Sequence, residues 1–420
     1  MTKYNEIKIL DSAGVNVGNV NASGEISISL ENLAAALSSN SGTQLNTTPF
    51  SSDGNEGIQL QNESGTAYGV KHIENKPRVS TMPYLYDIAE GNVPDHSGLF
   101  KVGYNPEVTT TEETIWSAGG VYEFPEAEQQ MEVVSTDNTQ DIGTVIKGDA
   151  TGNTVVSDPD PIDPLTQLSD DDVDFTAATA VEVGDCVIFS PHDQSAYPAW
   201  GYVTAVAQHT LTFADGLSDG SSTASRPYAV IDLSASTGAQ VVGFFYLDED
   251  YIQYGEIVVL NGTTPVATVN TDLYRINSFA VIAAGSNCKP IGDLSITNLA
   301  GTIEYSHITA EYTISRQLVF TVPAGVTGYV SGGTISASTP NDTKVQTERV
   351  IVRTNENPDF QFRTGCLFYP IAEIVVCNET IPITFELPLK INEKTDFIVS
   401  GQGFTGFDGP INAVFRGWLE

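Results

Sequence analysis

A short aromatic run offers the clearest binding chemistry in the sequence. Residues 197–202 read YPAWGY, which places Tyr197, Trp200 and Tyr202 close together in the chain. Such rings can stack on sugars or anchor a protein partner, because each offers a large apolar face and a polar tip. We therefore predict these three residues as candidate contacts for a glycan or a protein partner. For Trp116, by contrast, we favour an ordinary core position over a sugar-stacking platform.

Two runs of Asp residues suggest calcium chemistry, but their spacing does not fit it. The first run contains Asp158, Asp160 and Asp163, and the second spans residues 170–174. Calcium takes roughly six to eight oxygen ligands from a curved loop. Neither run has the Asp-x-Asp-x-Asp-Gly order with a distal Glu. We interpret both runs as solvated acidic loops and predict no metal site.

The residue types that perform catalysis are present but scattered. The five histidines lie far apart, and the chain has no H-E-x-x-H or phosphate-binding-loop motif. With 53 Asp and Glu residues, many carboxylate pairs could resemble a glycosidase pair, whose separation the sequence does not give. We predict no catalytic residue and no cofactor, and we expect a protein that is not an enzyme.

The charge balance narrows the classes of partner. The chain has 420 residues, with 18 Lys and Arg against 53 Asp and Glu, and a formal net charge of −35. Such a surface repels nucleic acid and anionic membranes, and no apolar run is long enough for a transmembrane helix. The N-terminus lacks a signal-peptide pattern. We predict no nucleic-acid or membrane partner. The cysteines are predicted to be free thiols, with a bridge between Cys366 and Cys377 as the less favoured alternative; they are Cys186, Cys288, Cys366 and Cys377.

The elements that must position these residues are mostly β-strands. Thr, Val, Ile, Tyr and Phe are frequent, and turn residues recur at short intervals. The strongest local signal is Asn261-Gly262 between two apolar runs, which predicts a β-hairpin with a type I′ turn. Helical periodicity is confined to residues 30–37, where three leucines share one face.

Several motifs resemble a family of structural proteins from tailed bacteriophages, many of them marine. That family has runs close to E-x-V-x-L-N-G-T-T-x-V, T-x-E-T-I-W-x-x-G-G-x-Y-x-Y-P, W-T-V-P-A-G-Y-T-A-Y-L and L-P-L-K-F-x-E-K-T-D-I-x-V. The similar runs here are residues 256–266, 111–125, 318–330 and 387–399. The likeness covers residues 76–146 and 240–420.

The resemblance implies a mainly β fold with a jelly-roll-like antiparallel β-sandwich. The sandwich would be discontinuous, formed by residues 76–147 and 237–420. Residues 148–236 read as an inserted small β-barrel module, which also resembles a module of phage structural proteins. Residues 1–75 are interpreted as a small N-terminal anchor or docking region, with a disordered terminus as the alternative.

The resemblance also implies a function. The protein would be a non-enzymatic structural protein of a tailed phage virion, assembled in the host cytoplasm and exposed as capsid decoration or head fibre. Its partners would be other virion proteins, such as major capsid or tail proteins, and copies of itself, with a trimer favoured. The alternative is a tail-associated fibre, or a protein that binds a receptor or a host surface glycan. A polysaccharide-degrading tailspike ranks last, because no regular β-helix repeat is visible.

Overall fold

The structure is a computed structural model, and the chain divides into two compact units, Met1–His96 and Ser97–Glu420. In the second unit, the described residues are 97–149, 167–189, 199–213, 227–338, 348–354, 369–376, 378–403 and 409–420. In the first unit they are short strands and a few single positions. The predicted anchor ends at residue 75, whereas the compact unit ends at His96.

The first unit contains three small antiparallel groups of strands. The largest is β1 (Ile7–Leu10), β2 (Asn16–Val20) and β3 (Ile26–Ile28). The others are β4 (Leu45–Asn46), β5 (Gln59–Gln61) and β6 (Ala67–Gly69), and the pair β7 (His72–Ile73) and β8 (Lys76–Pro77). The helix predicted over residues 30–37 lies outside the described residues, and the anchor role of this region stays a prediction.

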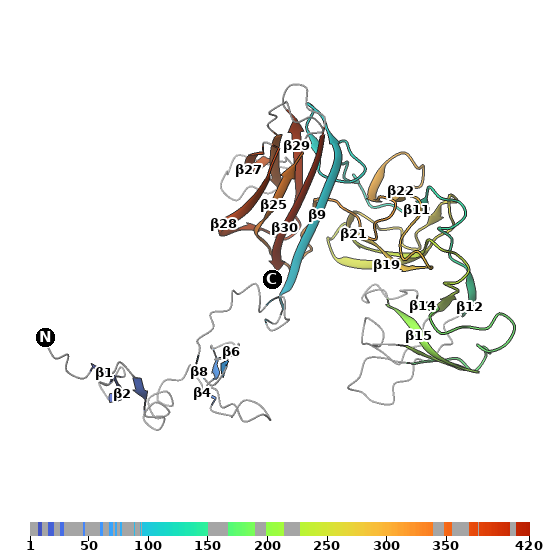
Figure 1. Cartoon of the computed structure of the whole chain (residues 1–420), viewed down its shortest axis with the longest axis horizontal. Coiled ribbons are helices and arrows are strands. Elements are labelled where there is room, and N and C mark those ends of the chain that lie inside the picture. The colour runs from blue at the N-terminus through green and yellow to red at the C-terminus, as the bar shows by residue number, and fades with distance from the viewer. Residues whose placement is uncertain are drawn as a thin grey trace. The chain divides into compact units, whose positions relative to one another are not determined.

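Two antiparallel sheets form what we call the C-terminal sandwich (Figure 1). One sheet has the order β28 (Thr380–Ile391), β25 (Gly328–Ala337), β30 (Gly409–Leu419) and β9 (Ser97–Val108). The other has the order β10 (Glu113–Thr114), β29 (Asp396–Gly403), β26 (Glu348–Thr354) and β27 (Tyr369–Val376), and β24 (Val319–Thr321) also pairs with β29. Both sheets contribute alternate side chains to one buried apolar core, as period-two strands do.

A second pair of antiparallel sheets forms the central sandwich. One sheet has the order β20 (Val266–Ala267), β11 (Met131–Ser135), β22 (Leu294–Asn298) and β23 (Glu304–Ile308). The other has the order β19 (Gln253–Val259), β18 (Ala239–Leu247) and β21 (Arg275–Ala284). Met131, Phe244, Tyr246 and Phe279 are among its buried core residues. The predicted discontinuous sandwich therefore contains two separate hydrophobic cores.

The inserted module is a six-stranded antiparallel sheet between β11 and β18. Its strand order is β12 (Val145–Asp149), β17 (Tyr228–Ile231), β14 (Cys186–Phe189), β15 (Ala199–Ala207), β16 (Thr210–Phe213) and β13 (Gln167–Ser169). Phe175, Phe189, Phe213 and Tyr228 belong to its own core. Since β12 and β13 are the two edges of the described sheet, closure into a barrel stays a prediction.

The hairpin predicted at Asn261-Gly262 is wrong. Strand β19 ends before this dipeptide and β20 follows it, but the two strands belong to different sheets of the central sandwich. The turn spans Asn261 to Thr264, whose amide bonds the Asn261 carbonyl at 3.1 Å, and Gly262 has a φ of 61°. Asn261 instead pairs with Ile142 in an isolated antiparallel bridge, so the loop before β12 replaces the hairpin partner.

The architecture confirms the predicted fold class. Every element described between Ser97 and Glu420 is a strand, and every pairing is antiparallel, as expected for a β-sandwich protein. Trp116 is 5% exposed and lies in an aromatic cluster with Tyr122, which confirms its core position. Among the described residues, no helix is long and apolar enough to cross a membrane.

Candidate functional site

The structure brings two of the three predicted contact residues together. Trp200 and Tyr202 lie on the same face of β15, because they are two residues apart. Their rings make an edge contact, with centroids 5.5 Å apart and planes at 84°. Tyr197 lies outside the described residues.

That face of β15 packs against the central sandwich. Trp200 is half-buried against an apolar cluster that includes Cys186 and Ile231 from the module and Val241 and Ala283 from the sandwich. The Tyr202 hydroxyl donates to the Ile282 carbonyl at 2.9 Å, although its side chain remains 38% exposed. Both residues therefore attach the module to the sandwich, and contact with a glycan stays a prediction.

The second acidic run is used inside the module. Asp170 is buried and accepts a hydrogen bond from the Tyr228 hydroxyl at 2.8 Å. Asp174 accepts from the hydroxyl and amide of Thr176, which holds the pKa of its carboxyl below the usual range. The first run lies outside the described residues. In the ranges that are described, no group of three His, Cys, Asp or Glu residues is arranged to hold a metal.

The most strongly organised polar site joins the two sandwiches. Arg275 on β21 forms a two-pronged ion pair with Asp396 on β29, with Nε to Oδ1 at 2.9 Å and Nη2 to Oδ2 at 3.1 Å. Both side chains are buried, at 7% and 5% exposure. Burial opposes the charge on Arg275, but the hydrogen bonds and charge of Asp396 outweigh it and raise the Arg275 pKa. Such a pair is directional and water-excluded, so it fixes the two sandwiches in one register.

The Nη1 group of Arg275 is also bonded, and two aromatic rings lie against the guanidinium. Nη1 donates to the carbonyls of Pro125 and Tyr274, each at 3.0 Å. The guanidinium carbon lies 3.8 Å from the centroid of the Tyr274 ring and 4.8 Å from that of Phe124. Asp396 accepts a further bond from the Thr321 hydroxyl at 2.6 Å. This satisfied, stacked arrangement is typical of a structural clamp, and we call it the Arg275 clamp.

A second set of bonds lies beside the Arg275 clamp. The Asn277 side chain donates to the Thr321 carbonyl and accepts from the Thr321 amide, both at 2.8 Å. The Lys101 ammonium donates to the Asn277 carbonyl. It lies 5.0 Å from the centroid of Phe320. No carboxylate among the described residues pairs with Lys101, and burial lowers its pKa from 10.5 to about 8.

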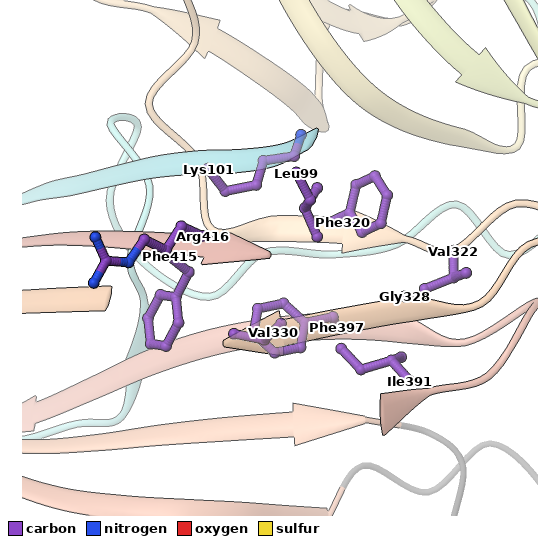
Figure 2. A pocket seen from close by; sticks show the side chains of 10 residues that line it. All are labelled: Leu99, Lys101, Phe320, Val322, Gly328, Val330, Ile391, Phe397, Phe415 and Arg416. Atoms are coloured by element: carbon purple, nitrogen blue, oxygen red, sulfur yellow. The ribbon is translucent and has the colours of Figure 1, made fainter. Parts of the chain in front are cut away.

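The stem of Lys101 lines a small pocket at one end of the C-terminal sandwich (Figure 2). Apolar side chains from both sheets form most of its wall, including Phe320, Phe397 and Phe415. Figure 2 shows the Lys101 amine turned away from this apolar lining. Besides Lys101, the residues that line this pocket include one charged residue, Arg416.

The residues of the 111–125 run build a turn rather than a reactive site. One carboxylate oxygen of Glu113 accepts from the Thr109 hydroxyl at 2.6 Å, and the other from the Gly120 amide at 3.2 Å. The Thr114 hydroxyl accepts from the Tyr122 amide at 2.9 Å. Gly120 has a φ of 70°, which glycine adopts without strain. The run closes a tight loop beside β10.

Asp141 is a second structural centre, in the central sandwich. It is fully buried and accepts from the Ser135 hydroxyl at 2.7 Å and the Ala239 amide at 2.9 Å. It also accepts from the amides of Ile291 and Gly292, at 3.0 Å and 2.8 Å. One carboxylate therefore holds three separate chain segments together.

Comparisons with known proteins identify no relative. No family model matches the sequence, and neither a curated protein nor a solved structure matches it.

Sequence reasoning did not single out Arg275, Asp396 or Asp141. A weak signal existed for Arg275, because it is a charged residue inside an otherwise apolar strand run, LYRINSFAVIAA. No comparable signal marks Asp396 or Asp141 among the 53 acidic residues.

Proposed function

We propose that this protein is a non-enzymatic structural protein of a tailed phage virion, exposed on the particle as capsid decoration or head fibre. It acts by assembling onto the particle, with other virion proteins and copies of itself as partners. A trimer is the favoured state. The virion is its place of action, after assembly in the host cytoplasm.

One observation carries this proposal: the runs that resemble phage structural proteins meet at the framework that joins the two sandwiches. Phe124 and Pro125, at the end of one run, contact Arg275. Asp396, in another run, pairs with Arg275, and Thr321, in a third, bonds Asp396. Residues that serve packing and register in this way fit a protein whose task is to hold a shape.

The abundance of acidic residues also fits an exposed particle protein. A net charge of −35 keeps a protein soluble at high copy number and disfavours contact with packaged DNA. This observation agrees with an exterior position.

Quantitative mass spectrometry of purified particles tests the proposal. We expect peptides of this chain in gradient-purified particles at a constant ratio to the major capsid protein, after washing in high salt. Peptides found only in the soluble lysate would contradict a virion role.

The alternative function is a tail-associated fibre, or a protein that binds a receptor or host surface glycan. The exposed part of Tyr202, beside Trp200, is the observation that favours it. A glycan array probed with the full chain and with Tyr202→Ala would decide it. Binding lost in the variant supports the alternative, and no binding by either protein removes it.

A further inference from the structure

Outward positions on the neighbouring strands β9 and β30 have an unusual composition for so acidic a chain. Leu99 packs against the core, so the alternation along β9 turns Phe100, Val102 and Tyr104 outward. Phe100 is 66% exposed. Opposite these residues on β30 lie Arg416, Val414 and Asn412. None of these outward positions is Asp or Glu.

An arginine held between two tyrosine rings borders this face. The Arg316 guanidinium carbon lies 4.3 Å from the centroid of Tyr104 and 3.7 Å from that of Tyr312. Tyr312 is 46% exposed. Stacking on the two rings restrains the guanidinium plane, so a docking group would meet its terminal amino groups.

Arg316 has no acidic partner in the part of the chain that the structure describes. Among the described residues its buried Nε finds no hydrogen-bond acceptor, and no carboxylate there forms an ion pair with Arg316 or Arg416. Arg, Tyr and Phe are enriched at the centres of protein interfaces, whereas Asp, Glu and Lys are depleted there. We call the set Phe100, Tyr104, Tyr312, Arg316 and Arg416 the aromatic–arginine face.

A complementary surface exists on the same molecule. Asp248, Glu249 and Asp250 lie in the turn between β18 and β19, and Asp272 accepts from the hydroxyl of Tyr246 on β18 at 3.2 Å. With Glu128, whose pKa responds to these four charges, we call them the acidic loop surface. The pKa of Glu128 is raised by desolvation and then by repulsion from the other four. None of the five forms an ion pair among the described residues. Their mutual repulsion would be relieved by a cationic partner.

We infer that the aromatic–arginine face of one copy docks on the acidic loop surface of a second copy. The contact joins two different surfaces, so it is head-to-tail, and such contacts close into rings when the rotation permits. Charge complementarity identifies a second copy as the partner. The positively charged face favours an acidic protein surface, and this chain, with a formal net charge of −35, has one. The inference deepens the homo-oligomer part of the proposed function, and solution measurements test it without any particle.

Sedimentation or light scattering of the full chain over a range of concentrations tests the inference. We expect self-association that weakens with salt and is reduced more than about ten-fold by Arg316→Glu with Arg416→Glu. Lys147→Glu is the control for Arg316→Glu alone, because it changes net charge equally and Lys147 lies in the inserted module, outside both surfaces. Phe100→Ser provides a second test of the face should the Arg316 variant fold poorly by circular dichroism.

A mixing experiment tests the pairing of the two surfaces. Glu249→Lys with Asp250→Lys should also abolish self-association, and an equal mixture of this variant with the Arg316→Glu, Arg416→Glu variant should associate again. A wild-type chain that stays monomeric at its highest soluble concentration would overturn the inference. So would association that survives both sets of substitutions, or variants that fail to reassociate on mixing.

Discussion

Removing Arg275 should uncouple the two sandwiches and destabilise the protein strongly. Arg275→Met keeps most of the stem but deletes four hydrogen bonds, two to Asp396 and one each to the Pro125 and Tyr274 carbonyls. Asp396 would remain buried and charged, with its principal partner gone. Breaking one side of a buried ion pair costs roughly 3 to 5 kcal/mol, so we expect a loss of about 4 kcal/mol.

The double variant Arg275→Met with Asp396→Leu separates the ion pair from its packing. Replacing both charges by apolar groups removes the uncompensated charge, so the double variant should be more stable than either single variant. Lys289→Ala is the matched control, because its pair with Glu311 is exposed, at 39% and 71%. An exposed pair contributes about 0 to 1 kcal/mol.

Urea unfolding gives the free energies, and hydrogen exchange locates the effect. Unfolding can proceed in steps, since the described chain has several cores, so amide exchange in β21 and β29 should be followed as well. We expect faster exchange in both strands for Arg275→Met and no change for Lys289→Ala. A loss below about 1 kcal/mol, or a double variant no better than the single ones, would refute the clamp.

Three further predictions concern other positions. Between pH 8 and 10.5, Lys101 binds fewer protons in the folded chain than in the unfolded chain. The free energy of unfolding of the wild type should therefore rise with pH by up to about 3 kcal/mol relative to Lys101→Met. Urea unfolding at several pH values measures this difference, and the same pH dependence in both proteins would contradict it. Asp141→Asn should cost about 2 to 4 kcal/mol in thermal unfolding, because its amide nitrogen replaces one carboxylate oxygen and would face at least two of the four donors. Asp232→Asn in an exposed turn should cost little. Tyr202→Phe should cost about 1 kcal/mol and speed amide exchange around Ile282, since it removes one hydrogen bond between module and sandwich; unchanged exchange would count against this attachment.

Strand identity was largely predictable from the sequence, whereas strand pairing was not. Period-two alternation and frequent turns marked β26, β29 and β30 as strands. Their partners depend on contacts between segments far apart in the chain. Asn261-Gly262 illustrates the difference, because the turn formed but its flanking strands joined different sheets. A local sequence signal does not specify which other strand a given strand pairs with.

The candidate sites also differ in how far the sequence could predict them. Trp200 and Tyr202, two of the three predicted contact residues, lie in contact, because their spacing along β15 is local. Arg275 and Asp396 are 121 residues apart, and no spacing rule connects them. The outward position of Phe100 also required the pairing of β9 with β30.

Cryo-electron microscopy of the intact particle tests most directly whether this chain is an exposed virion protein. We predict density for both sandwiches and the inserted module on the outside of the particle, repeated with the symmetry of the head or, for the alternative function, of the tail. A map that accounts for the whole exterior with other chains would contradict the proposed function.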